Sequence, residues 1–167
     1  DITFDSYPYE YGSGTMLSSL IPLWAYVDGP RYLLKRLASK TKRAKMKEDN
    51  RPIWDNWEDW NRRYWVSGVV SEKNKWCEGL TLQEISDRLG KDDIMDVVCD
   101  LLIEENLQVS VTKHGGNERD IKVIMHHPAG MICSDGILLG GMPNPRSYGT
   151  FPKVIRWLVR EEKTLIL

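Results

Sequence analysis

Apolar residues follow two different spacings in different segments of this chain. In some segments apolar and polar residues alternate one by one, as they do in a strand with one buried face. In others the apolar residues recur every three or four positions, as they do on one face of a helix. The first pattern predicts strands over residues 1–9 and 107–111, and two further strands are predicted over the short segments 63–71 and 129–133.

The helical pattern fills most of the space between these strands. Thr81-Leu82-Gln83-Glu84 is a capping-box sequence that predicts a helix ending at Gly90. A longer apolar helix follows, with Asp92 as its predicted cap and Asn106 as its end. Further helices are predicted over 30–47, 117–126 and 151–162, with a broken helix over 16–27 and a Gly/Ser loop over 10–15.

The order of these elements predicts the fold class. Strand, helix, strand and helix follow one another at the C-terminal end, which favours βα units in a parallel sheet. The segment 16–106 carries mostly helical signals and is interpreted as an insertion. We therefore expect an α/β fold in three parts: a strand with its loop over 1–15, the helical insertion over 16–106, and the final βα units over 107–167.

Three tryptophans of the insertion stand three residues apart. Trp54, Trp57 and Trp60 would share one face of a helix at this spacing. Aromatic residues on a single helical face are typical of a core, so we interpret them as core residues rather than as a platform for substrate.

Composition and charge narrow the classes of function. The 167 residues carry a formal net charge of −1 and have a pI near 6.4, which gives no general attraction to nucleic acid or to anionic membranes. No apolar run approaches the roughly 20 residues that cross a bilayer, and no signal peptide is recognised. The chain opens on Asp1 rather than Met, which leads us to expect a piece of a longer protein.

The cysteines favour a reducing environment. Cys77, Cys99 and Cys133 are odd in number and widely spaced, which argues against a disulfide framework and against a four-cysteine zinc site. A cytoplasmic location is therefore expected. Cys133 lies near Asp135, but we interpret it as a small apolar residue of a buried strand rather than as a nucleophile.

Candidate chemistry appears directly after the last predicted strand. The sequence Ser134-Asp135-Gly136 places a carboxylate where a strand ends and a Gly- and Pro-rich loop begins. In α/β barrel enzymes, catalytic groups stand at such strand ends. The predicted loop then brings in Arg146, a cation that can hold a carboxylate through two parallel hydrogen bonds.

Three motifs in this order resemble the N-acyl-D-amino-acid deacylases, a branch of the amidohydrolase superfamily. The first is Asp5-Ser6-Tyr7-Pro8-Tyr9 with the trailing Ser13 and Thr15, and the second is the weaker Leu20-Ile21-Pro22-Leu23-Trp24-Ala25 followed by Gly29. The third joins Ser134-Asp135-Gly136 to Asn144-Pro145-Arg146-Ser147-Tyr148-Gly149-Thr150-Phe151-Pro152-Lys153. The matches span nearly the whole chain, and their common order makes the resemblance more specific than any one motif.

The resemblance implies a fold, a cofactor and roles for four residues. The fold would be part of a (β/α)₈ barrel, and the parent enzyme would use zinc to hydrolyse N-acyl-D-amino acids to a carboxylate and a D-amino acid. Asp135 would neighbour or bind the zinc and carry a proton from the metal-bound water to the leaving amine. Tyr7, Ser13 and Arg146 would hold the carboxylate of the substrate.

The sequence departs from the family pattern at three positions. Asn144 stands where the family has His, Lys153 stands where it has Arg, and Gly14 separates Ser13 from Thr15. The Asn cannot become cationic as a His can, and the extra Gly changes the geometry that follows Ser13.

A complete metal site is not expected in this chain. His126 and His127 are adjacent, so on a helix their side chains point about 100° apart and do not easily share one metal. The family's zinc ligands, a Cys and several His, would come from strands that precede Asp1. We therefore expect this piece to be inactive alone, with exposed sheet edges that self-association could cover.

Several other functions stay open. Leu80 to Gly90 is also typical of the first helix of a helix-turn-helix, which makes a winged-helix-like nucleic-acid module the rival from another class. Six carboxylates against one Lys between Lys91 and Asn106 argue against it, because phosphates would repel them. The basic stretch Arg31 to Lys47 could attract phosphates, but we interpret it as a solvated helix face. Within the superfamily, a dihydroorotase-like cyclic amidase or a non-catalytic relative remains possible on the sequence alone.

Overall fold

The computed structural model describes residues 2–55, 59–138 and 140–166, without the side chains at 14, 15 and 51–55. The chain divides into two compact units. The first unit combines Asp1–Ser13, His114–Leu138 and Pro143–Leu167, and the second combines Gly14–Lys113 with Leu139–Met142. The two ends of the sequence therefore form one unit and its middle forms the other. The three-part division at 15 and 106 stays a prediction.

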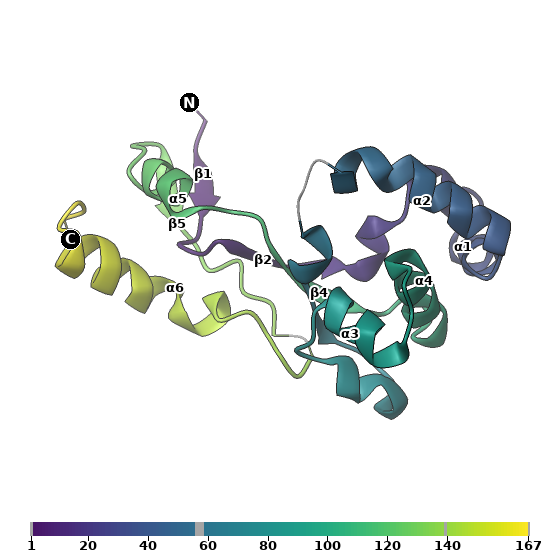
Figure 1. The fold of residues 1–167 in the computed structure, drawn as a ribbon. Helices are drawn as coiled ribbons and strands as arrows, with labels where there is room; N and C mark the ends of the chain where they lie inside the picture. The colour runs from purple at the N-terminus through teal and green to yellow at the C-terminus, as the bar shows by residue number, and fades with distance from the viewer. Residues whose placement is uncertain (1, 56–58, 139, 167) are drawn as a thin grey trace. The chain divides into compact units, whose positions relative to one another are not determined.

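The first unit contains a pair of parallel strands. β1 (Phe4–Ser6) lies beside β5 (Gly130–Ile132), with Phe4 opposite Gly130 and Ser6 opposite Ile132 (Figure 1). A side chain at residue 130 would press against the ring of Phe4, which explains the glycine. The two predicted strands at 1–9 and 129–133 are confirmed in shorter form, and so is their parallel direction.

Two helices accompany these strands. α5 (Glu118–Met125) begins at the cap residue Asn117, whose side chain accepts a hydrogen bond from the backbone N–H of Asp120, as the pattern over 117–126 predicts. α6 (Arg146–Val154) continues without a break as a π-helical segment (Ile155–Glu161).

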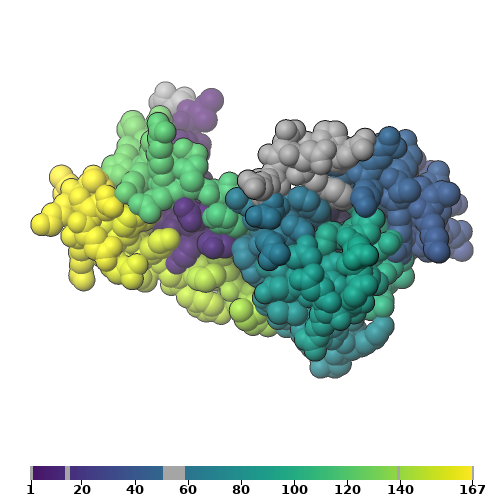
Figure 2. All heavy atoms as spheres, viewed as in Figure 1, coloured from purple at the N-terminus to yellow at the C-terminus, as the bar shows by residue number. Residues whose placement is uncertain are grey.

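The C-terminal segment packs against α5. Lys122 of α5 forms an ion pair with Glu162 at 2.9 Å and lies over the ring of Trp157. Figure 2 shows the side chains of α5 in green beside the yellow C-terminal segment. In contrast, apolar side chains of the two strands, among them Met131 at 53% exposure, face solvent. This unit therefore buries little of its sheet.

The second unit is mainly helical. Two 3₁₀ turns (Leu17–Leu20 and Leu23–Tyr26) stand where Pro22 was predicted to break a helix. The longer elements are α1 (Pro30–Leu37), α2 (Lys40–Asp55), α3 (Leu82–Leu89) and α4 (Ile94–Glu104), with further 3₁₀ turns at Trp60–Arg62 and Glu72–Cys77. Its hydrophobic core gathers Leu17, Leu33, Leu37, Met46, Val66, Leu82, Ile85, Val97, Val98, Leu102, Val109 and Val111.

A three-stranded sheet accompanies these helices, in the order β2 (Tyr11–Met16), β4 (Ser110–His114), β3 (Tyr64–Gly68). β3 and β4 are antiparallel, with Tyr64 opposite Lys113 and an irregularity between Val66 and Gly68. The predicted strand over 63–71 is confirmed. The strand predicted over 107–111 is shifted to Ser110–His114. It pairs antiparallel with β3, so the interpretation that it opens a parallel βα unit is wrong.

Several element boundaries were predicted wrongly. The helix predicted over 30–47 is two helices, with the break after Leu37, and α4 takes Asp93 rather than Asp92 as its cap. Most of the segment 10–15, predicted as a loop, belongs to the strand β2 (Tyr11–Met16), because β4 lies beside it and supplies the pairing that its glycines do not favour locally. Of the three tryptophans, only Trp60 has a described side chain, and it packs against the core; Trp57 and the side chain of Trp54 lie outside the described residues.

The described helices include none that is both long enough and apolar enough to cross a membrane. Cys77 and Cys99 are buried, whereas Cys133 is half-buried after β5, so it does not lie in a buried strand as predicted.

Candidate functional site

The four candidate site residues of the sequence lie together in the first unit. Arg146 begins α6, and its side chain is 1% exposed. Its Nη2 donates to a carboxylate oxygen of Asp135 at 2.8 Å and to the backbone carbonyl of Ser13 at 3.1 Å. Its guanidinium carbon lies 4.3 Å from the ring centroid of Tyr7, the distance of a cation–π contact. A buried guanidinium therefore connects all four residues.

Asp135 reaches Arg146 from the segment that follows β5. Its backbone has a φ of 42°, in the left-handed region that Asp adopts more readily than most residues. The next residue, Gly136, lies so close to Ser147 that an added Cβ would stand 3.0 Å from its Cα. The Ser-Asp-Gly sequence therefore lets this segment cross the first turn of α6 and aim the Asp135 carboxylate, which is 58% exposed, at Arg146.

Two polar atoms at this cluster are buried without a hydrogen-bond partner among the described residues: the hydroxyl oxygen of Ser13 and Nε of Arg146. Leaving such groups unpaired costs about 1–3 kcal/mol each. Both can donate a hydrogen bond, and an oxyanion is the acceptor that satisfies a guanidinium N–H best. The cluster is therefore suited chemically to a carboxylate ligand.

Tyr7 contributes differently from the expectation. The sequence assigns its hydroxyl a hydrogen bond to substrate, whereas the described contact is between its ring face and the Arg146 guanidinium. The role of the hydroxyl stays a prediction.

Asn144 has a positional role that sequence reasoning missed. Its side chain is 2% exposed, donates to the backbone carbonyl of Tyr11 at 3.2 Å and accepts from the backbone N–H of Arg146 at 2.9 Å. It therefore fixes the start of α6 and with it Arg146. An Asn two residues before a helical Arg was the available signal, because an Asn side chain readily accepts from the backbone N–H two residues further on.

The helix itself starts earlier than predicted. We expected Arg146 on a loop and a helix over 151–162, but α6 includes Gly149 and Pro152. Gly149 lets the Tyr9 hydroxyl lie directly against the helix, because a Cβ at this position would overlap that hydroxyl. Arg146 is consequently held by a helix, which fixes its backbone more firmly than a loop would.

The described residues contain no group of three or more His, Cys, Asp or Glu side chains placed to hold a metal. His127 Nδ1 accepts from the backbone N–H of Ala129 at 3.1 Å, and His126 Nδ1 contacts the carbonyl of Lys122 at 2.5 Å. These contacts belong to the end of α5. Asp135 would be a single ligand, so the described part of this chain does not by itself fit a zinc ion.

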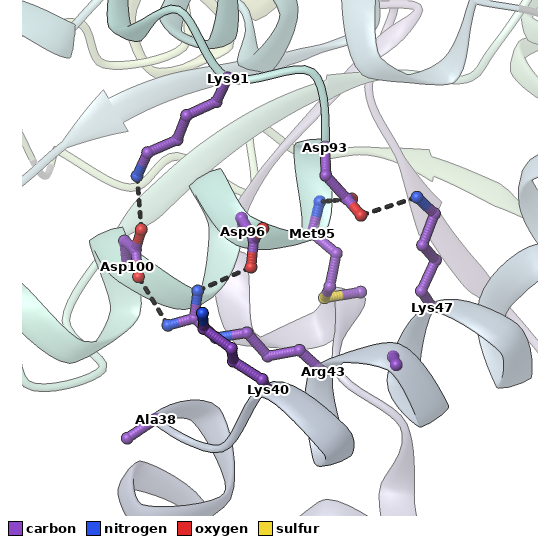
Figure 3. Close-up of a pocket in the computed structure, with 10 residues that line it drawn as sticks. Ala38, Lys40, Arg43, Lys47, Lys91, Asp93, Met95, Asp96 and Asp100 are labelled. Carbon is purple, nitrogen blue, oxygen red and sulfur yellow. Dashed lines mark hydrogen bonds and ion pairs between the residues drawn. The ribbon is translucent and has the colours of Figure 1, made fainter.

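The second unit has a charged hollow of about 710 Å³ between α2 and α4 (Figure 3). Arg43 holds Asp96 at 2.8 Å and Asp100 at 2.6 Å, and Lys47 holds Asp93 at 2.7 Å. Lys91 also pairs with Asp100. The basic stretch and the acidic helix, which gave opposite indications on nucleic-acid binding in the sequence, thus pair with each other. Since each of the three carboxylates already has a cation, this hollow is better explained as an ion-pair network than as a ligand site.

Comparison with family models gives no match. Among curated proteins, an N-acyl-D-aspartate deacylase from Alcaligenes xylosoxydans xylosoxydans is 30% identical over 81 residues, which are 45% of this chain and 16% of that protein. Among solved structures, a D-aminoacylase described as defining a novel subset of amidohydrolases is 25% identical with a TM-score of 0.60 over 99% of this chain.

A second solved structure shares the fold at 21% identity, with a TM-score of 0.63 over the whole chain. It is an N-acyl-D-glutamate deacylase from Bordetella bronchiseptica in complex with zinc and a phosphonate mimic of the tetrahedral intermediate. The chain spans about a quarter of the length of these two structures, 25% and 26%.

Proposed function

The resemblance to the D-aminoacylase family is confirmed by these matches, and on that premise we propose that this chain is part of a zinc-dependent amidohydrolase. The substrate would be an N-acyl-D-amino acid, and hydrolysis of its amide would release a carboxylate and a D-amino acid. The names of the related proteins support this substrate class.

The observation that carries the proposal is the buried, incompletely satisfied guanidinium of Arg146. A substrate carboxylate placed against it could accept from the unpaired Nε, while the unpaired hydroxyl of Ser13 donates to the same group. Fixing the carboxylate in this way orients the amide of the substrate. A role of these two atoms in binding would also explain why the chain buries a polar cluster at a cost in stability.

Asp135 would be the group that moves a proton. Amide hydrolysis requires a base for the attacking water and an acid for the leaving nitrogen, and one carboxylate can serve in turn as both. At present Asp135 is paired with Arg146 at 2.8 Å. A substrate carboxylate that takes over the guanidinium would release Asp135 for this task.

The proposal places the strands of the first unit in a (β/α)₈ barrel. The parallel pair β1 and β5 supports it, because neighbouring barrel strands are parallel and carry functional groups at their C-terminal ends. Tyr7 and Asp135 both follow such an end. The second unit would then be the insertion between the two strands.

Zinc would be held mainly by residues from outside this chain, because the described residues do not form a ligand set. We accordingly propose that the 167-residue chain alone is inactive. The test is to measure release of free amino acid from N-acetyl-D- and N-acetyl-L-amino acids, with zinc, for the longer natural polypeptide and for the 167-residue chain.

The longer polypeptide is expected to release the D-amino acid, and Asp135→Ala is expected to lower kcat by roughly 100-fold or more. Asp92→Ala removes an exposed carboxylate of the other unit and should leave the rate unchanged. D-selective release that survives Asp135→Ala would remove the role of Asp135. If neither isomer reacts although zinc is bound, a cyclic-amide substrate or a non-catalytic relative becomes the better interpretation. Turnover by the 167-residue chain would disprove its inactivity.

A further inference from the structure

A second cationic site lies further along the same helical segment of the first unit. Tyr9, Gly149, Pro152, Lys153 and Arg156 line an open hollow of about 420 Å³. A neighbouring hollow of about 230 Å³ shares Lys153 and Arg156. The two cations are three positions apart, which places them next to each other on a helical surface.

Lys153 lacks an ion-pair partner among the described residues. Its Nζ lies 4.2 Å from the ring centroid of Tyr9 and 5.5 Å from that of Trp157. Burial lowers the pKa of Lys153, Glu10 opposes that change, and Arg156 adds to it through repulsion. The Lys153 ammonium is half-buried near two aromatic rings and beside a second cation. A bound anion would stabilise its charge in this environment.

The nearby carboxylates are already engaged. Glu10 lies 3.5 Å from Nε2 of His114, and Glu118 pairs with Lys122 at 2.8 Å. Both line the smaller hollow and neither lines the larger one. Arg156 pairs with Glu161 at 3.5 Å, but its side chain is 71% exposed and Glu161 lines neither hollow. The larger hollow thus has two cations and no carboxylate in its lining.

Tyr9 adds a neutral donor to the larger hollow. Burial raises the pKa of its hydroxyl, partly offset by Arg156, so the group stays protonated near neutral pH. The Tyr9 ring and Pro152 supply apolar wall, and the absence of a side chain at Gly149 leaves room for the hydroxyl. Two charged donors and one neutral donor around an open hollow suit a small oxyanion.

We propose that the hollow lined by Tyr9, Gly149, Pro152, Lys153 and Arg156 binds a small oxyanion, the carboxylate or phosphate group of a ligand. This site is separate from the Arg146 cluster, and it does not rest on the proposed amidohydrolase activity.

The test is calorimetric titration of the 167-residue chain with inorganic phosphate and, in a second arm, with acetate. Saturable binding of either anion is expected, and the tighter of the two identifies the group preferred. Lys153→Gln combined with Arg156→Gln should weaken binding at least tenfold. Arg160→Gln, which removes an exposed cation from the same segment but not from the hollow, should change the affinity less than twofold.

Two further variants keep the test decisive if the double variant does not fold. Arg156→Gln changes an exposed side chain and should weaken binding in a folded protein, whereas Lys153→Arg keeps the charge and should retain it. No saturable binding of either anion, or equal weakening by Arg160→Gln and Arg156→Gln, would overturn the proposal.

Discussion

Arg146 is the largest of the fully buried side chains in the described residues, and it is a cation. Burying a guanidinium is unfavourable unless its N–H groups are paired, and here one carboxylate, one carbonyl and one aromatic ring share that task. The unpaired Nε and the unpaired Ser13 hydroxyl distinguish a binding role from a purely structural one. If the Asp135–Arg146 ion pair served only the fold, the fold would be more stable with both of these atoms hydrogen-bonded within the chain.

Ser13→Ala tests this distinction at a single atom. Because the hydroxyl is buried without a partner, and such a group costs about 1–3 kcal/mol, its removal should leave the free energy of unfolding of the chain unchanged or raise it. In the longer enzyme it should raise KM for N-acetyl-D-amino acids roughly 5- to 13-fold, which corresponds to the loss of one hydrogen bond of about 1–1.5 kcal/mol. Urea unfolding and steady-state kinetics measure the two quantities.

Ser147→Ala is the matched control, because this hydroxyl neighbours Arg146 but donates, at 3.4 Å, to the carbonyl of Ile137. It should change neither KM nor stability by much. A Ser13→Ala protein that loses stability and keeps its KM would assign the hydroxyl to the fold instead.

Among the elements, those that are held together by contacts between residues close in sequence were predicted best. The capping box of α3 is present as expected: the Thr81 hydroxyl accepts from the backbone N–H of Glu84 at 3.1 Å, and the Glu84 carboxylate accepts from the backbone N–H of Thr81 at 2.7 Å. Gly90 ends the helix with a φ of 62°. These interactions span three or four residues each, so a short stretch of sequence contains all of them.

Elements that depend on distant partners were predicted poorly. The strand β4 shows the alternation of a strand, but nothing in that pattern tells whether its partner is parallel or antiparallel. The start of α6 depends on Asn144 reaching Tyr11, a contact across 133 residues. In the candidate site, the motif resemblance picked out Asp135, Arg146, Ser13 and Tyr7, but the Asp135–Arg146 pair and the unpaired atoms follow only from the fold.

Glu105 shows the same limit. At the end of α4 its carboxylate, 3% exposed, accepts from the backbone N–H groups of Val70 and Ser71, from the Ser71 hydroxyl and from the Asn74 amide. No sequence pattern marked it. It joins α4 to the 3₁₀ turn at Glu72–Cys77 through these four hydrogen bonds.

Glu105→Gln should therefore destabilise the chain by about 2–3 kcal/mol, because the new amide turns a donor towards donors and the charge-assisted bonds are lost. The neighbouring Glu104 has a 39% exposed side chain, which pairs with the exposed Lys73 and accepts from Asn74, so Glu104→Gln should cost less than about 1 kcal/mol. Urea unfolding monitored by circular dichroism compares the two. Equal effects would mean that the buried network is not what joins these elements.

At the scale of the whole molecule, the sequence predicted the α/β class, which is consistent with the related structures, but not how unevenly the apolar core is shared between the two units. The large core lies in the second unit, whereas the strands of the first expose apolar side chains such as Met131 and Ile132. Composition could not reveal this imbalance, because it reports how many apolar residues exist and not which of them find a partner. The charges show the same effect: a net charge of −1 conceals an ion-pair network between a basic and an acidic helix.

Those charges predict how the molecule responds to acid. Burial alone would raise the pKa of Glu105 and of Asp100, but hydrogen bonds from Ser71 and Asn74, and from Lys91 and Arg43, outweigh it and leave both pKa values below their ordinary 4.5 and 3.8. A carboxylate with a lowered pKa stabilises the fold fully above its unfolded pKa, and this contribution is lost as the pH falls through its folded pKa. The free energy of unfolding should thus be nearly constant from pH 7 to about 5 and decrease steeply below about 4.5, near the unfolded pKa of Glu. Glu105→Gln removes one of these groups, so its unfolding free energy should be lower at pH 7 and depend less on pH below 4.5. Urea titrations at a series of pH values measure both slopes, and identical slopes for the two proteins would show that Glu105 does not bind its extra proton on unfolding.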